Sequence, residues 1–457
     1  MRDACLQRVS SHTQIQMHLE HFKSLKGGRR YIGHEEGRRM MGKQQQSWVG
    51  ESRGRTSVTR TARARAPEQR WRRGGVSARA HSNGNDPDPD GPLCHGVFCY
   101  VPKESQPRAP LRIAVTGAAG QIANHLLWHI ASGTVFGSDQ PVELNLLASE
   151  RSYAATEGVA MELEDSVLPL LRFVSIGTNP REIFDSADYV LLVGAQPRKE
   201  GQQRSDLLEQ NGQLFRDQGL ALADAGKAST RVLTVGNPVC TMALVASENA
   251  QPTVPRDNFY ALTRLDQNRA KSQLAIKAGV HYDDCQIWSL GNHSATLVPD
   301  YVNATISGRP ATEVIDEEWL QDSFLSRVRK RGSNVIRKWG KSSGASTAIA
   351  IVHSLQDIAF PTPNGSLYSL AKRTDDNPFG LPSGLICSMP CRTREDGSVE
   401  FARADEMQLN DWLRERLNET VDELLSERSC IQHLIGEEGA ACNVQGDTEI
   451  PGETTLV

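Results

Sequence analysis

The sequence lacks the features that mark membrane-spanning, repetitive or metal-binding proteins. No apolar run among its 457 residues approaches the roughly 20 residues that a helix needs to cross a bilayer, so we expect no membrane partner. No segment of the chain repeats. Cys387 and Cys391 are close in sequence, but no second cysteine pair or histidine cluster with ligand spacing accompanies them. We therefore predict buried thiols there and no metal.

Acidic side chains are scarce at the N-terminus, where residues 1–80 contain 18 Lys or Arg and only 6 Asp or Glu. Apolar periodicity is also weak, so this part cannot bury enough surface to fold. An Arg- and Ser-rich, acid-poor N-terminus is typical of an organelle transit peptide, and we predict that residues 1–80 form one. The alternatives are a basic arm that binds nucleic acid, a partner we do not expect, or an over-long gene model whose true start is Met40 or Met41.

After a Pro- and Gly-rich linker at residues 83–92, the first strong structural pattern is Leu111-Arg-Ile-Ala-Val-Thr-Gly-Ala-Ala-Gly-Gln-Ile-Ala123. It predicts a buried strand, a glycine turn and a helix. Such a turn lets the backbone approach a pyrophosphate, which the amide groups of the helix N-terminus then bind. Taken alone, the same pattern also fits glycine turns that bind nothing.

Strands and helices alternate along the next 150 residues. Apolar runs predict strands at 142–148, 189–194 and 231–236, and helical patterns lie between them. This alternation indicates a parallel sheet with helices on both faces. We predict a dinucleotide-binding domain over 111–260 and a second, catalytic domain over 261–425, with one long helix at 319–339 and a small-residue helix at 344–359.

Three later segments carry side chains suited to hydride transfer to a carbonyl acid. A glycine-flanked loop holds Arg198 and Arg204, a predicted helix carries Asp266 three residues before Arg269, and His293 lies among small residues. A carbonyl oxygen that accepts hydride needs a proton donor titrating near neutrality, as histidine does, and a carboxylate to stabilise the imidazolium. Arginines bind the carboxylates of the substrate.

From residue 111 onward these motifs stand in the same order as in the lactate/malate dehydrogenase family, which the chain resembles. The resemblance implies a Rossmann-type α/β fold, a doubly wound parallel sheet followed by an α+β substrate domain, and a homodimer. The motifs are Gly117-Ala-Ala-Gly-Gln-Ile-Ala123, Pro197-Arg198 with Arg204, Gly236-Asn237-Pro238, Leu265-Asp266 with Arg269, and Gly291-Asn292-His293-Ser294.

The resemblance also implies a role for individual residues. His293 is the acid/base and Asp266 its partner, Arg269 binds the carboxylate beside the reacting carbon, and Arg198 and Arg204 bind the distal carboxylate. The implied cofactor-binding residues are Gly117, Gly120, Gln121, Ile122, Ser149, Arg151, Ser152, Asn211, Gln218 and Asn237, the last of which also contacts substrate.

Charge predicts the substrate. Arg198 lies where lactate-type relatives carry a neutral glutamine, and a buried arginine without its carboxylate is costly. We therefore expect a dicarboxylate, oxaloacetate or malate.

The end of the second predicted strand indicates the cofactor. NAD-dependent sites usually present an acid to the ribose 2′-hydroxyl, but here Ser149 takes that place. Arg151 and Ser152 are suited to bind a 2′-phosphate, although Glu150 is an unfavourable neighbour unless it points away. The run is similar to that of the plastid branch of the family, which uses NADP. The alternative is a solvated turn with a surface arginine.

Of the nine cysteines, two pairs lie near the ends of the folded chain. Their spacing alone also fits a zinc site or no role. The resemblance to the plastid branch implies that both form disulfides which thioredoxin reduces, on extensions at 81–110 and 426–457, and that an acidic tail with Glu449 or Glu453 occludes the oxidised site. The pairs are Cys94 with Cys99 and Cys430 with Cys442.

The chain departs from the family at several positions. Cys240 and Met242 replace asparagines, Leu290 replaces a tryptophan, and Ser272 stands where some plastid relatives carry a cysteine. Two alternatives follow: an NAD-dependent enzyme without redox control, or a non-catalytic redox-sensing relative. We expect the chloroplast stroma, with the mitochondrial matrix as the alternative.

Overall fold

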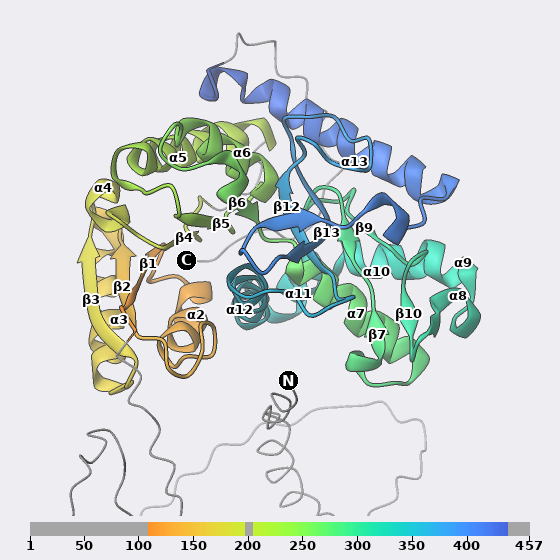
Figure 1. The fold of residues 1–457 in the computed structure, drawn as a ribbon, viewed down its shortest axis with the longest axis horizontal. Helices are drawn as coiled ribbons and strands as arrows, with labels where there is room; N and C mark the ends of the chain where they lie inside the picture. Colours follow the sequence, from red (N-terminus) through yellow and green to blue (C-terminus); the bar gives the residue numbers. More distant parts are fainter. Residues whose placement is uncertain (1–107, 197–203, 437–457) are drawn as a thin grey trace, which may run out of the picture. The chain divides into compact units, whose positions relative to one another are not determined.

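The computed structural model describes residues 108–196 and 204–436, and a nine-stranded sheet organises this part of the chain (Figure 1). Its strand order is β14-β13-β12-β6-β5-β4-β1-β2-β3, and the six strands from β3 to β6 run parallel. These six are β1 (Leu111–Thr116), β2 (Val142–Leu147), β3 (Leu171–Gly177), β4 (Tyr189–Leu192), β5 (Arg231–Thr234) and β6 (Phe259–Ala261).

The strands predicted at 142–148, 189–194 and 231–236 are confirmed, each ending one or two residues early. The strand β3 was not predicted. It lies at the edge of the sheet and leaves side chains such as Phe173 largely exposed, so its sequence lacks the apolar pattern of a buried strand.

Helices join the parallel strands and cover both faces of the sheet, which confirms the doubly wound fold. In Figure 1, α5 and α6 lie above the strands and α2 lies below them. Within the described residues, no helix is both long and apolar enough to cross a membrane. The connecting helices are α2 (Gln121–Ala131), α3 (Tyr153–Asp165), α4 (Pro180–Phe184), α5 (Arg204–Ala225) and α6 (Val239–Asn249).

The chain reverses its winding direction at β1, which is flanked by β2 on one side and β4 on the other. At such a switch point, here between β1 and β4, the loops that follow the two strands lead in opposite directions and leave a crevice at the carboxyl ends of the strands. Here those loops contain Gly117 and Gly194. A Cβ atom on Gly117 would lie 2.7 Å from the Cα of Gly194, so only glycine permits this approach.

Three antiparallel strands extend the same sheet beyond β6. The strand β12 (Tyr368–Arg373) pairs with β6 through Ala371 and Ala261, and β13 (Ile386–Thr393) and β14 (Val399–Phe401) follow. The expected second half is therefore continuous with the first through one sheet, and its predicted boundary at 260–261 stays a prediction.

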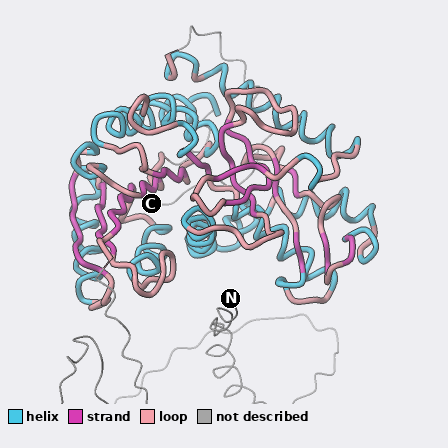
Figure 2. The backbone as a smooth tube through the Cα atoms, viewed as in Figure 1, coloured by secondary structure: helices cyan, strands magenta, loops and turns pink. Residues whose placement is uncertain are grey.

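The second half otherwise contains helices and short strands, separated by the long loops visible in Figure 2. The helix predicted at 344–359 is confirmed and packs on α2 and α7. The remaining elements are α7 (Arg264–Ala278), β7 (Cys285–Gln286), β8 (Ser289–Leu290), β9 (Val298–Pro299), β10 (Thr305–Ile306), β11 (Arg309–Pro310), α8 (Ala311–Val314), α12 (Ala345–Ala359) and α13 (Asp411–Cys430), with short 3-10 turns between them.

The prediction of one long helix at 319–339 was wrong. The segment is divided into α9 (Glu317–Trp319), a π-helical turn (Leu320–Phe324), α10 (Leu325–Arg329) and α11 (Arg331–Trp339). The break comes at Lys330, with φ −87° and ψ 4°. A π turn holds one more residue than an α-helical turn. Apolar residues spaced by four occur in both, so the sequence pattern does not distinguish them.

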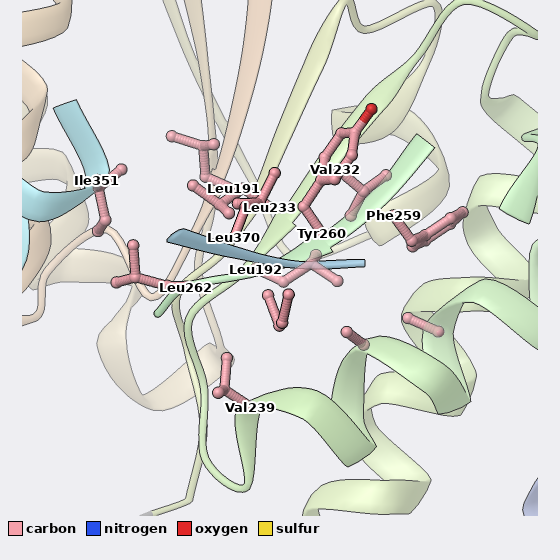
Figure 3. Close-up of a cluster of buried hydrophobic side chains, with 14 of the residues drawn as sticks. Leu191, Leu192, Val232, Leu233, Val239, Phe259, Tyr260, Leu262, Ile351 and Leu370 are labelled. Atoms are coloured by element: carbon pink, nitrogen blue, oxygen red, sulfur yellow. The ribbon is translucent and has the colours of Figure 1, made fainter. Parts of the chain in front are cut away.

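The core lies between the sheet and its helices. Figure 3 shows Leu191 and Leu192 of β4 beside Val232 and Leu233 of β5, all at most 1% exposed. Successive residues point to opposite faces of a strand, and here both faces are covered, so the strands are continuously apolar. This core fixes the carboxyl ends of β4 and β5, from which the site loops leave.

Candidate active site

The glycine turn after β1 leaves the N-terminus of α2 available to an anion. Gly117 has φ +66°, and its carbonyl accepts a 2.9 Å hydrogen bond from the amide of Gly120, which precedes the first residue of α2. No side chain caps this end of the helix. Amide groups at an uncapped helix N-terminus favour a phosphate, so the turn fits the pyrophosphate of a dinucleotide.

The next two predicted cofactor residues connect α2 to the rest of the site. The Gln121 Nε2 atom donates to the carbonyl of Ser342 at 3.2 Å, and Ile122 packs against the main core. A Cβ atom on Gly344 would lie 2.5 Å from the Gln121 Nε2 atom. The glycine turn is thus held against the loop that precedes α12.

The segment after β2 forms a capped turn. The hydroxyl groups of Ser149 and Ser152 lie 2.9 Å apart, and the Ser152 hydroxyl accepts a 3.0 Å bond from the Ser149 amide. Arg151 and Glu150 are exposed, and Arg151 makes no ion pair with any residue that the structure describes. Two hydroxyls and an uncommitted guanidinium fit a phosphate better than they fit a bare ribose hydroxyl.

The Asn211 side chain binds the backbone of two loops. Its buried side chain donates to the carbonyls of Asn237 at 2.7 Å and Gln196 at 3.1 Å and accepts from the Gln196 amide at 2.8 Å. It therefore joins the loops after β4 and β5. Gln218, two turns later on α5, is 3% exposed, and its Oε1 atom has no hydrogen-bond partner among the described residues.

His293 and Asp266 are brought together although 27 residues separate them. Asp266 lies in the first turn of α7 with no exposed surface, and its Oδ2 atom contacts the Nδ1 atom of His293. A carboxylate at Nδ1 favours the tautomer protonated there, which makes Nε2 the nitrogen suited to exchange a proton with a substrate.

Arg269 lies on the same face of α7. Its Nη1 atom is 3.5 Å from Asp266 Oδ1, and its Nη2 atom donates to the hydroxyl of Ser343 at 3.3 Å. Burial lowers the pKa of Arg269, and the neighbouring Asp266 opposes that shift. The guanidinium remains charged near neutral pH, so Asp266 lies between a cation and the imidazole.

The buried cysteine Cys240 lies next to the backbone of His293. The backbone amide of His293 donates to its thiol, and burial raises the pKa of that thiol well above its usual range. Met242 is also fully buried. The replacements of asparagine thus place a thiol at the His293 backbone and an apolar side chain in the core.

Cys387 and Cys391, predicted to be buried thiols, are buried and form no disulfide, and burial raises the pKa of each to about 12. Leu290 is fully buried in β8. Among the described residues, no group of His, Cys, Asp or Glu is arranged to bind a metal.

Several predicted residues fall outside the described residues. Arg198, Cys94, Cys99, Cys442, Glu449 and Glu453 are among them. Arg204 is the first residue of α5, but its side chain is not described. Cys430, the last residue of α13, is disulfide-bonded, whereas its pairing with Cys442 stays a prediction.

Sequence reasoning missed a group on α13. Thr420, Glu423 and Glu427 contact the two residues that flank His293. Their spacing of three and four residues puts them on one helix face, a pattern that is visible in the sequence but equally typical of a solvated surface.

Two family models match most of the chain from residue 111 onward. Residues 111–258 match the NAD binding domain of lactate/malate dehydrogenase, and residues 263–435 match the alpha/beta C-terminal domain of the same family.

Curated relatives cover most of the chain. It is 50% identical over 372 residues to the chloroplastic malate dehydrogenase [NADP] of Flaveria bidentis, which covers 79% of this chain and 81% of that protein. The chloroplastic malate dehydrogenase [NADP] 1 of Sorghum bicolor is 50% identical over 370 residues, which cover 79% of this chain and 85% of that protein. A malate dehydrogenase of Protochlamydia amoebophila is 43% identical over 330 residues, or 71% and 98%.

Solved structures share the fold across both activities of the family. The malate dehydrogenase of Naegleria fowleri superposes with a TM-score of 0.68 at 36% identity, covering 72% of this chain and all of that one. The lactate dehydrogenase of Trichomonas vaginalis in complex with NADH and oxamate gives the same TM-score at 32% identity, with coverage of 71% and 99%.

Proposed function

The chain belongs to the lactate/malate dehydrogenase family, and from that premise we propose that it is an NADP-dependent malate dehydrogenase, interconverting oxaloacetate and L-malate. The observation that carries the proposal is the contact of His293 with the buried carboxylate of Asp266, beside Arg269. Relatives at half identity that are named for this activity support it.

His293 would supply the proton that the reaction needs. When bound, NADPH would supply the hydride that reduces the carbonyl carbon of oxaloacetate. The protonated imidazole donates its Nε2 proton to the carbonyl oxygen, which becomes the hydroxyl of malate, and the buried Asp266 stabilises the imidazolium before the transfer. In the reverse direction the neutral imidazole takes that proton back.

Three arginines would position the two carboxylates of the substrate. Arg269 binds the carboxylate next to the reacting carbon, because it lies beside the His293–Asp266 pair. Arg198 and Arg204 are proposed to bind the distal carboxylate. A monocarboxylate such as pyruvate leaves those guanidinium groups unpaired, so we expect it to be a poor substrate.

The residues that would hold NADP follow β1, β2 and β5 or lie on α5. Gly117, Gly120, Gln121 and Ile122 would hold the pyrophosphate end, and Asn211, Gln218 and Asn237 would line or brace the groove toward the nicotinamide. Ser149, Arg151 and Ser152 would bind the 2′-phosphate, supported by the hydroxyl pair and by an Arg151 guanidinium that makes no ion pair with a described residue. Glu150, the acidic neighbour, is exposed, and the hydroxyl pair consists of Ser149 and Ser152 alone.

Regulation and location belong to the same proposal. We infer a chloroplast stromal homodimer whose pairs Cys94–Cys99 and Cys430–Cys442 are reduced by thioredoxin. The disulfide at Cys430 and the chloroplastic names of the relatives support this inference.

The test is oxaloacetate reduction by the purified full-length protein with NADPH or NADH, before and after incubation with a reduced dithiol. We expect activity that favours NADPH and rises after reduction, and little turnover of pyruvate. Activity with NADH that ignores the dithiol would keep the catalytic assignment and reject NADP and redox control. No turnover in any condition would reject the enzyme and favour a non-catalytic redox-sensing protein.

A further inference from the structure

One face of α13 holds the loop that carries His293. Thr420, Glu423 and Glu427 point from this face toward residues 291–296. The close approach is visible at Gly291, which has φ +87° and where a Cβ atom would lie 2.3 Å from the Cγ2 atom of Thr420. The loop and the helix therefore contact each other directly.

Glu427 is a carboxylate with no exposed surface. Its Oε1 atom accepts a 3.0 Å hydrogen bond from Asn292 Nδ2, and its Oε2 atom accepts one from the Thr241 hydroxyl. Thr241 lies in α6, four residues after Asn237. Glu427 thus joins the residue before His293 to the helix that follows the proposed Asn237 contact.

Glu423 accepts hydrogen bonds from three side chains of the same loop. Its Oε2 atom accepts from Asn292 Nδ2 at 2.9 Å, from Thr296 Oγ1 at 2.6 Å and from the Ser294 hydroxyl. Asn292 and Ser294 are the immediate neighbours of His293. Hydrogen bonds to these glutamates therefore reach the residues on both sides of His293: Asn292 donates to both, and Ser294 to Glu423.

The side chain of Asn292 is oriented by these carboxylates. Its Nδ2 atom donates to both glutamates, and its backbone amide donates to Thr420 Oγ1 at 2.7 Å. Its Oδ1 atom is buried without a hydrogen-bond partner in the described part of the chain. Turning the amide over would place that oxygen against two carboxylates, so only one orientation is favourable.

Burying a carboxylate is unfavourable before its hydrogen bonds are counted, and a well-packed apolar residue often stabilises the fold better. A fully buried Glu427 beside the loop of the proposed acid/base is therefore better explained by the geometry it imposes than by its contribution to folding.

We propose that Glu427, together with Glu423, is a positioning residue that sets the His293 loop so that the imidazole meets Asp266. The inference rests on the proposed function, since it concerns the acid/base of that reaction. Neither glutamate touches the reacting atoms in this role. They act through Asn292 and Ser294.

The experiment compares Glu427→Gln and Glu423→Gln with the reduced full-length enzyme. The matched control is Asp422→Asn, which removes an exposed carboxylate from the same helix. For each protein we would measure kcat, the KM for NADPH, and the pH profile of kcat/KM for oxaloacetate. Circular dichroism and the unfolding midpoint would report folding.

We expect Glu427→Gln to lower kcat about tenfold or more while the KM for NADPH changes less than about twofold. The pH above which kcat/KM falls should move down by about half a unit or more, because a displaced imidazole is less well stabilised as its cation. Glu423→Gln should give a smaller change in the same direction, and Asp422→Asn none.

Each other outcome has a defined meaning. A wild-type protein without oxaloacetate reductase activity would reject the proposed function, whatever the variants do. An active wild type with folded glutamine variants whose pH profiles are unmoved would overturn the positioning role, even where activity falls with the folded fraction. If Glu427→Gln does not fold, the half-buried Glu423→Gln decides by the same criterion.

Discussion

At the scale of single residues, Asp266 shows how a buried carboxylate depends on its partners. It has no exposed surface and contacts both His293 and Arg269. We expect Asp266→Asn to lower kcat by about 10³-fold or more, because the amide stabilises neither the required tautomer nor the imidazolium. The pH limit for oxaloacetate reduction should also move downward, since the imidazole loses its proton more readily.

A surface histidine–carboxylate pair provides the control. His281 and Asp283 lie 3.3 Å apart with side chains that are 59% and 60% exposed. Asp283→Asn removes the same chemical group from the same kind of pair, but at an exposed position, and should leave kcat unchanged. Equal losses in both variants would refute the role of Asp266.

Arg151 is predicted to select the cofactor. Replacing it with glutamine should lower kcat/KM for NADPH by about 10- to 100-fold, the value of a charge-assisted bond to a phosphate, and leave the value for NADH nearly unchanged. Steady-state kinetics with both cofactors tests this. Arg309→Gln, at an exposed arginine paired with Glu313, is the control. A parallel loss with NADPH and NADH would contradict the assignment.

At the scale of elements, the contact between α2 and the start of α12 connects the cofactor turn to the substrate side. A Cβ atom on Gly344 would lie 2.5 to 2.8 Å from three side-chain atoms of Gln121. Gly344→Ala should therefore displace Gln121, break its bond to the Ser342 carbonyl, and cost about 1–3 kcal/mol of unfolding free energy. The KM for NADPH should rise several-fold.

Gly158 gives the opposite expectation for the same substitution. It lies inside α3, and a Cβ atom there would have no neighbour within 4 Å. Gly158→Ala should therefore stabilise the protein by about 0.5–1 kcal/mol through helix propensity and leave the KM for NADPH unchanged. Denaturant unfolding of both variants measures the contrast. A stable Gly344→Ala variant with normal KM would show that the contact is not tight.

At the scale of the whole molecule, His353 makes stability depend on pH. Burial in α12 lowers its pKa to about 4, and Arg264 and Lys271 of α7 add to the shift. A depressed folded-state pKa contributes stability that is present above the unfolded value of 6.5 and is lost as pH falls through about 4. The protein should therefore weaken across this window.

The variant His353→Gln should lose less stability in that window than the wild type, by about 2 kcal/mol at pH 4. The two should differ by a constant amount above pH 7. Urea unfolding at a series of pH values measures this, and His281→Gln, at an exposed histidine, should follow the wild type. Parallel curves for His353→Gln and wild type would show that His353 titrates normally.

Much of the first half of the fold was predictable because its signals are local. Alternating apolar residues, the turn at Gly117 and the helix after it lie within about a dozen residues, so the pattern and the structure describe the same short segment. Strand β3 and the π turn at Leu320–Phe324 were missed, since an exposed edge strand lacks the apolar pattern of a buried one and apolar residues spaced by four occur in both α and π turns.

The sequence by itself determined the doubly wound fold, the chemical types of the site residues and the family, because these depend on local patterns and residue identity. The tertiary structure decided which groups meet: Asp266 with His293, and Glu427 with Asn292 from 135 residues away. Long-range contacts depend on how helices pack against a sheet, and the spacing of Thr420, Glu423 and Glu427 fits a solvated face as well as a buried one. Only packing distinguishes the two.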